Sequence, residues 1–121
     1  MVLSAAATDE TSGLMGEREF TAMRPGSILC NVARGSLIDE EVLPAALRAG
    51  RPGAAILDVT RVEPLPEDSP LWSTPGVYLS PHSSTSMDGY NDRLLGLFAD
   101  NLLRYQRGAP LQNLVDRARG Y

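Results

Sequence analysis

Short apolar runs that alternate with segments of helical pattern constrain the fold of this chain more than any other feature of its sequence. Four such runs occupy residues 2–7, 27–33, 54–59 and 77–80. Helical patterns cover residues 16–23, 40–50 and about 85–108. Strands that alternate with helices form parallel sheets, and predominantly apolar runs are typical of parallel strands covered on both faces. The sequence therefore predicts an α/β fold, a partial doubly wound parallel sheet of about four strands with flanking helices.

Several apolar side chains are expected in the core of such a fold. Those that lie inside an apolar run or recur at helical spacing are Cys30, Met87, Leu94 and Phe98. Pro44 lies within the predicted helix 40–50 and removes a backbone donor beyond the first turn, so we expect a local distortion there.

Composition limits the possible partners. The 121 residues carry a net charge of −4, and the eleven basic residues are all scattered arginines, which argues against a nucleic-acid partner. The start of the chain has neither a signal-peptide pattern nor a membrane-spanning stretch, so we expect no membrane partner. Because Cys30 is the only cysteine, no internal disulfide forms and a cytoplasmic location is expected. One histidine and one cysteine do not make a metal-ligand set, so no metal site is predicted.

Charged side chains follow the predicted strands at the ends where open parallel sheets bind ligands. Arg34 follows the second run, and Asp58 lies in the third, with Glu63 soon after. His82, the only histidine, follows the fourth. A carboxylate beside an imidazole orients the ring and favours its protonated form, and an arginine binds a carboxylate with two hydrogen bonds. The set suits a small keto or hydroxy acid, although Arg34 also fits a simpler role as the first solvated residue after a strand.

The order and spacing of three motifs add a resemblance to a known family. The segments MRPGSILCNVARGSLIDEEVLPAALRAG, GAAILDVTRVEPLP and SPLWSTPGVYLSPH contain Asn-x-x-Arg-Gly, Asp-Val-x-x-x-Glu-Pro and Pro-His in that order. The chain resembles the D-isomer-specific 2-hydroxyacid dehydrogenases over residues 2–116. The resemblance implies that residues 1–108 form the C-terminal part of a Rossmann-type NAD(P)-binding domain, and that residues 109–121 form a tail. It also implies NAD or NADP as cofactor, a small 2-keto or 2-hydroxy acid as substrate, and a homo-oligomer, expected to be a dimer.

The resemblance assigns catalytic roles to three side chains. Arg34 matches the arginine that binds the substrate carboxylate and keto oxygen, and Glu63 matches the acid paired with the catalytic histidine. His82 matches that histidine, which protonates the keto oxygen as hydride arrives from the nicotinamide. The expected catalytic residues are therefore Arg34, Glu63 and His82.

The same resemblance implies cofactor contacts. Asp58 matches the aspartate that hydrogen-bonds the nicotinamide carboxamide. The other residues expected beside the nicotinamide are Val32, Ala33, Arg34, His82, Ser83 and Ser84. The two serines fit a helix-capping role equally well. Trp72 is expected to anchor the long loop 60–76 onto the sheet, with a place in the substrate pocket as the alternative.

One part of the family pattern is missing from these residues. The Gly-x-Gly-x-x-Gly turn that holds the cofactor pyrophosphate is absent, and by the resemblance it lies upstream. Two function classes follow. The chain is the C-terminal catalytic portion of an NAD(P)-dependent D-2-hydroxyacid dehydrogenase, inactive by itself, or it is a truncated, non-catalytic Rossmann-type module that acts in binding or association.

Overall fold

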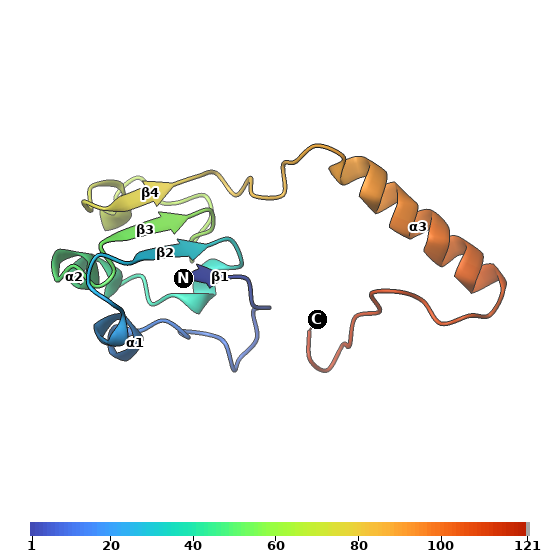
Figure 1. Ribbon diagram of the computed structural model, residues 1–121, viewed down its shortest axis with the longest axis horizontal. Coiled ribbons are helices and arrows are strands. Elements are labelled where there is room, and N and C mark those ends of the chain that lie inside the picture. Colours follow the sequence, from blue (N-terminus) through green and yellow to red (C-terminus); the bar gives the residue numbers. More distant parts are fainter. Residues whose placement is uncertain (121) are drawn as a thin grey trace. The chain divides into compact units, whose positions relative to one another are not determined.

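The first of two compact units holds the sheet. A computed structural model describes residues 1–120, and the chain divides into Met1–Ser83 and a second unit that begins at Ser84. Four parallel strands lie in the order β1-β2-β3-β4 (Figure 1). Their bounds are β1 Val2–Leu3, β2 Ile28–Asn31, β3 Ala54–Leu57 and β4 Val77–Leu79. The predicted α/β class with about four parallel strands is confirmed.

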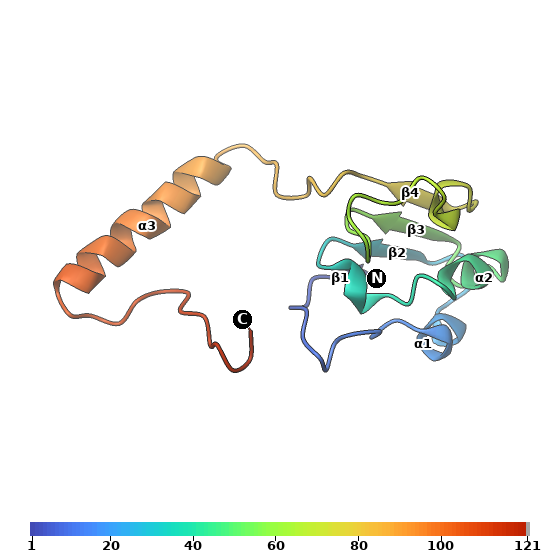
Figure 2. The same ribbon diagram turned by 180° about the vertical axis from the view of Figure 1, so that it is seen from behind.

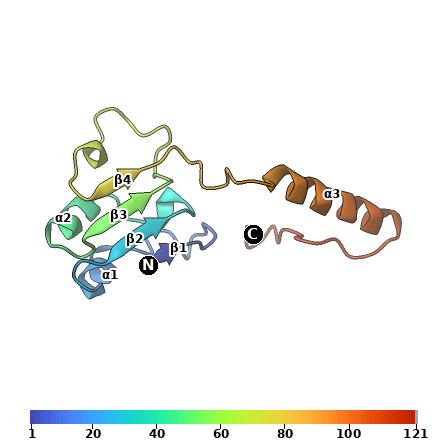
Figure 3. The same ribbon diagram turned by 45° about the horizontal axis from the view of Figure 1, so that its top comes forward.

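The register of the strands aligns their carboxyl ends. Asn31 of β2 pairs with Leu57 of β3, and Leu57 pairs with Leu79 of β4. Because all strands run in the same direction, the loops that follow them start at one edge of the sheet (Figure 3). This edge is where the sequence predicts the functional side chains.

Two short helices cover one face of the sheet. They are α1 (Glu17–Ala22) and α2 (Leu43–Arg48), which lie side by side (Figures 1 and 2). Phe20 of α1 and Leu47 of α2 join Leu29 of β2 in the buried core. Strands in consecutive order with right-handed connections place these helices on the same face.

The opposite face of the sheet is open within residues 1–83. We define the open sheet face by Val2, Ile28, Cys30, Ile56 and Tyr78; Cys30 is partly buried, and the other four are exposed by 65%, 53%, 42% and 63% respectively. The prediction that strand residues 54–59 are covered on both faces, and that Cys30 lies in the core, is wrong for this unit. The physical reason is that both of its α-helices pack on the other side.

Pro44 fits the helix that it was expected to distort. α2 begins at Leu43, so the proline occupies the first turn, where its missing N–H has no intrahelical partner to lose. The predicted distortion is wrong because the helix starts three residues later than the pattern predicted.

The second unit contains one long helix, α3 (Tyr90–Gln106), which ends close to the predicted position. None of its residues is buried, and Leu94 and Phe98 are exposed by 52% and 66%. Met87, before the helix, is also exposed. The prediction that these side chains are core is wrong, because helical spacing identifies an apolar face and not what covers it. The predicted boundary at residue 108 stays a prediction. No helix among residues 1–120 is long and apolar enough to cross a membrane.

Candidate active site

The loop after β2 is shaped by a buried asparagine. The Asn31 side chain is fully buried; its Oδ1 accepts from the Ala33 N–H at 3.1 Å, and its Nδ2 donates to the Arg34 carbonyl at 2.8 Å. Ala33 is buried, whereas Val32 and Arg34 are exposed. The Arg34 guanidinium donates to the Ala33 carbonyl at 2.6 Å. The Asn-x-x-Arg-Gly motif contains the signal for Asn31, but the motif alone assigns this residue no role.

Gly35 lets this loop lie directly against the loop after β3. A Cβ at Gly35 would lie 2.0 Å from the Thr60 carbonyl carbon and 2.3 Å from the Arg61 nitrogen. No side chain fits at that distance, so glycine is required next to Arg34. This role of Gly35 could not be predicted from the sequence pattern.

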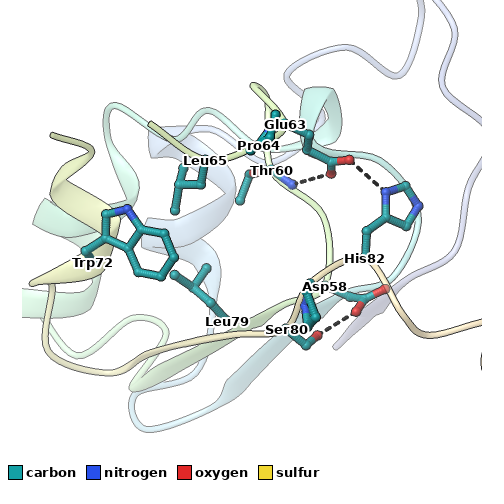
Figure 4. Close-up of a pocket in the computed structure, with 10 residues that line it drawn as sticks. Asp58, Thr60, Glu63, Pro64, Leu65, Trp72, Leu79, Ser80 and His82 are labelled. Carbon is teal, nitrogen blue, oxygen red and sulfur yellow. Dashed lines mark hydrogen bonds and ion pairs between the residues drawn. The ribbon is translucent and has the colours of Figure 1, made fainter. Parts of the chain in front are cut away.

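Glu63 bridges its own loop and the loop after β4. One carboxylate oxygen, Oε1, accepts from the Thr60 N–H at 3.0 Å, and the other, Oε2, lies 2.7 Å from His82 Nδ1 (Figure 4). The two side chains are 37% and 44% exposed, so solvent reaches the pair. An imidazole N–H donating to a carboxylate is the arrangement that orients a histidine for proton transfer.

The loop after β4 is tied to the end of β3 through Asp58. The His82 N–H donates to the Asp58 carbonyl at 2.9 Å. The Asp58 side chain is buried, and its Oδ1 accepts from the Ser80 hydroxyl at 2.5 Å and from the Ser83 N–H at 2.9 Å. His82 itself has a φ of +51°, in the left-handed region that residues other than glycine rarely adopt.

The two glutamates near this edge have pKa values displaced in opposite directions. The hydrogen bond from His82, the Thr60 N–H and the charge of Arg34 lower the pKa of Glu63. Burial raises the pKa of Glu40, against the opposing effect of the Arg61 N–H, which donates to Glu40 Oε1 at 2.6 Å. Glu63 is therefore ionised at neutral pH, and His82 Nδ1 carries the proton that it shares with Glu63. The second ring nitrogen, Nε2, takes no part in this contact with Glu63.

A pocket of about 670 Å³ lies beside the His82–Glu63 pair. Leu65, Trp72 and Leu79 line one side of it, and the pair lies on the other (Figure 4). The Trp72 indole N–H donates to the Pro66 carbonyl at 2.8 Å, and the side chain is 58% exposed. Its neighbour Leu71 is 2% exposed and anchors the loop in the core, so the anchoring role predicted for Trp72 belongs to Leu71.

Some of the predicted site residues line one pocket at the carboxyl edge of the sheet, and others lie on neighbouring loops. Asp58, Glu63 and His82 line the same pocket, and Arg34 lies on the neighbouring loop, where its charge acts on Glu63. Ser83 is next to His82 and contacts Asp58 through its backbone. The catalytic and cofactor-binding roles of these residues stay predictions.

The remaining predicted residues lie outside that pocket. Val32 and Ala33 are in the Arg34 loop, and Ser84 begins the second unit. Within residues 1–120, no three His, Cys, Asp or Glu side chains come together in a way that could hold a metal ion.

The fold and the residues at its carboxyl edge indicate the class of protein to which the chain belongs. The chain is a parallel α/β unit whose carboxyl edge carries an imidazole–carboxylate pair and an arginine loop, which is suited to acid–base chemistry on a small ligand. The family model of the D-isomer specific 2-hydroxyacid dehydrogenase, NAD binding domain, matches residues 1–84. The chain belongs to this family.

Curated relatives and solved structures agree with the family. The chain is 36% identical over 110 residues to a glyoxylate reductase of Korarchaeum cryptofilum, covering 91% of this chain and 33% of the relative. It is 38% identical over 114 residues to a glyoxylate/hydroxypyruvate reductase A of Klebsiella pneumoniae, covering 94% and 36%. The chain therefore spans about a third of the length of these relatives.

Similarity in structure extends over nearly the whole chain. A D-isomer specific 2-hydroxyacid dehydrogenase from Xanthobacter autotrophicus Py2, solved in complex with NADPH and MES, superposes with a TM-score of 0.87 at 39% identity. The match covers 99% of this chain and 49% of that one. An NADPH-dependent glyoxylate/hydroxypyruvate reductase from Sinorhizobium meliloti, in complex with NADP and sulfate, gives a TM-score of 0.82 at 27% identity, covering 99% and 39%.

The close approach at Gly35 generates a stability prediction. Gly35→Ala forces the loops after β2 and β3 apart, and we expect it to lower the free energy of unfolding by about 1–3 kcal/mol, measured by urea denaturation. Gly16→Ala is the matched control, because a Cβ there makes only ordinary van der Waals contacts, with the flexible Glu19 carboxylate at 3.6 Å and the Gly13 carbonyl oxygen at 3.9 Å. The control is expected to cost less than about 1 kcal/mol. Equal losses in the two variants would contradict the described contact.

The opposite pKa displacements of the two glutamates generate a pH prediction. The lowered pKa of Glu63 means that its ionised form stabilises the fold at neutral pH, and that this stabilisation is lost as the pH falls through the lowered pKa. Glu63→Gln is expected to lower the melting temperature at neutral pH and to have little effect in acid. The raised pKa of Glu40 has the opposite sign, so Glu40→Gln, which keeps an acceptor for the Arg61 N–H, is expected to raise the melting temperature at neutral pH. Thermal melts across pH 3–8 check both, and shifts of the same sign at neutral pH would refute the assignment.

Proposed function

We propose that this chain supplies the substrate-binding and proton-transfer groups for reversible hydride transfer between NAD or NADP and a small 2-keto or 2-hydroxy acid. The observation that carries the proposal is the 2.7 Å contact between His82 Nδ1 and Glu63 Oε2 at the carboxyl edge of the sheet, in a member of this family. The names of relatives that act on glyoxylate and hydroxypyruvate support small 2-keto acids as the substrate class.

Three side chains have separate roles in the proposed reaction. Arg34, exposed on its loop, binds the substrate carboxylate with two hydrogen bonds. His82 Nε2 donates a proton to the keto oxygen in reduction and accepts it back in oxidation. Glu63 holds the opposite ring nitrogen and stabilises the imidazolium before the proton is transferred. Bound NADH or NADPH supplies the hydride.

The residues present fit one end of this cofactor. The buried Asp58 carboxylate and the loop of Val32 and Ala33 offer hydrogen-bonding and apolar groups at the sheet edge, which suits a nicotinamide. Ser83 and Ser84, which follow His82, are proposed to lie beside it. The 121 residues contain no Gly-x-Gly-x-x-Gly turn for the pyrophosphate, so we infer that catalysis requires a nucleotide-binding segment supplied by other residues.

A non-catalytic binding module is the second candidate. The open sheet face favours it, because an uncovered apolar surface is typical of an interaction site. The two candidates are distinguished by activity: the longest polypeptide encoded in frame with these residues is assayed with glyoxylate and hydroxypyruvate, using NADH and NADPH. Cofactor oxidation in this assay supports the enzyme, whereas folded protein without turnover or cofactor binding supports the module. The 121-residue chain alone is expected to show no measurable turnover.

Substitutions at the proposed catalytic residues test the roles directly in that polypeptide. His82→Gln removes the proton donor, and we expect kcat to fall by about two to four orders of magnitude. Arg34→Lys keeps the charge but loses the two-pronged contact, so kcat/KM should also fall severely. Glu63→Gln should be milder, with reduction failing at a lower pH than in the parent enzyme. Steady-state kinetics across pH measure all three, and an enzyme indifferent to the loss of His82 would refute the proposal.

We further propose that the chain forms homo-oligomers, a dimer in the first instance, in the cytoplasm. The open sheet face favours association, and so does the outer edge of β1, which pairs with no further strand among residues 1–120. Exposed strand edges and apolar sheet faces readily bind other chains. Light scattering of the isolated chain is expected to give a mass above that of the 13.0 kDa monomer. Tyr78→Glu should shift the chain toward monomer, whereas the exposed control Tyr105→Glu, outside this face, should not. A monomer at all working concentrations would contradict the proposal.

A further inference from the structure

The turn that carries His82 is held on both sides by one oxygen atom. Asp58 Oδ1 accepts a hydrogen bond from the Ser80 hydroxyl, two residues before the histidine, and another from the Ser83 N–H, one residue after it. The Asp58 backbone carbonyl accepts from the His82 N–H at 2.9 Å. The Ser80 N–H also donates to the carbonyl of Leu57, the last residue of β3, at 3.0 Å, so four hydrogen bonds fix residues 80–83 to the end of β3.

This attachment coincides with an unfavourable backbone conformation. With a φ of +51°, His82 lies in the left-handed region, which a residue with a Cβ adopts only when its surroundings hold it there. The imidazole is 44% exposed, so side-chain packing contributes little to holding it. The turn is fixed by its hydrogen bonds to Asp58 and Leu57 and by a second bond of the His82 N–H, to the Ser80 carbonyl at 3.0 Å. The ring is fixed by its contact with Glu63.

We propose that Ser80 is a positioning residue for His82. Its hydroxyl and the Ser83 N–H, both bound to Asp58 Oδ1, hold the turn in the left-handed conformation that directs Nδ1 at Glu63. The Ser80 hydroxyl thereby determines which ring nitrogen carries the proton when the imidazole is neutral. This role goes beyond the proposed function, because it concerns the geometry of the pair and holds whether or not the chain takes part in catalysis.

The chemistry of the pair makes this role measurable. A Glu63 carboxylate only accepts hydrogen bonds, so a correctly placed neutral His82 carries its proton on Nδ1. If the turn relaxes, the ring loses this constraint and the proton moves to Nε2 in part of the molecules. The hydrogen bond from His82 is also the leading cause of the lowered pKa of Glu63, so that pKa should rise toward its ordinary value.

Long-range ¹H–¹⁵N NMR of the full 121-residue chain tests the proposal, because its single histidine gives one unambiguous set of ring signals. At a pH where the ring is neutral, the parent chain is expected to show the Nδ1–H tautomer. Ser80→Ala should give a mixture of tautomers and a raised Glu63 pKa in a ¹³C side-chain titration. Ser80→Thr keeps the hydroxyl and should restore both properties.

A matched control separates positioning from a general loss of stability. Ser73→Ala removes a serine hydroxyl that donates to the Pro70 carbonyl at 3.3 Å, away from His82, and should leave the tautomer and the Glu63 pKa unchanged. A folded Ser80→Ala chain with the parent tautomer and the parent Glu63 titration would overturn the proposal.

Hydrogen exchange in the parent chain gives a second measurement that needs no variant. The Ser83 amide lies on an exposed residue, yet its bond to Asp58 should slow exchange by at least about tenfold relative to an unstructured chain. If Ser80→Ala does not fold, this measurement still tests the attachment of the turn to Asp58, on which the proposed role of Ser80 depends. Exchange of the Ser83 amide at the unstructured rate would overturn the proposal.

Discussion

Parallel pairing between β2, β3 and β4 brings the ends of three strands to one edge, and every contact of the candidate site starts from there. Asn31, Leu57 and Leu79 lie in register across the sheet. The residues that follow them belong to three loops far apart in sequence, yet Asp58 and His82 are joined by backbone and side-chain hydrogen bonds. A shift of one strand by a single residue would move its side chains to the other face and separate the pair.

Buried polar side chains at the ends of the strands hold the loops that carry the exposed site residues. Asn31 and Asp58 are buried at the ends of neighbouring strands, and each accepts or donates hydrogen bonds within the loop that carries a charged residue. Burial of such groups is unfavourable unless they are hydrogen-bonded, so the loops are held in the conformations that satisfy them. Arg34 and His82 are thus exposed side chains on fixed backbones, which is what binding and proton transfer at a surface require.

The sequence predicted the sheet and the pairing of loops because both follow from local patterns. Apolar runs identify strands, and parallel order brings their carboxyl ends together, so Glu63 and His82 could be expected near one another. Burial could not be predicted in the same way. Cys30 and Phe98 have the composition of core residues, but their environment depends on which elements pack against them, and in each unit one apolar face has no described cover.

Close contacts between the backbones of two loops could not be predicted from sequence patterns either. Gly35 is required because the Thr60 backbone lies where a Cβ would be, which is a property of two loops that are distant in sequence. Pro44 shows the reverse case: its effect depends on where the helix begins, and a shift of three residues turns a helix breaker into an accepted first-turn residue. Helix ends are set by a few local contacts, so sequence patterns locate them only approximately.

We propose that His82 and Arg34 act on one small 2-keto acid at this edge. A crystal structure of a polypeptide that joins these residues to a nucleotide-binding segment, with NADPH and the unreactive analogue oxamate, tests it most directly. We expect the oxamate carboxylate to bind the Arg34 guanidinium and the oxamate carbonyl oxygen to lie within hydrogen-bond distance of His82 Nε2. Oxamate bound at the edge with His82 Nε2 directed away from it, or bound without Arg34, would contradict the account.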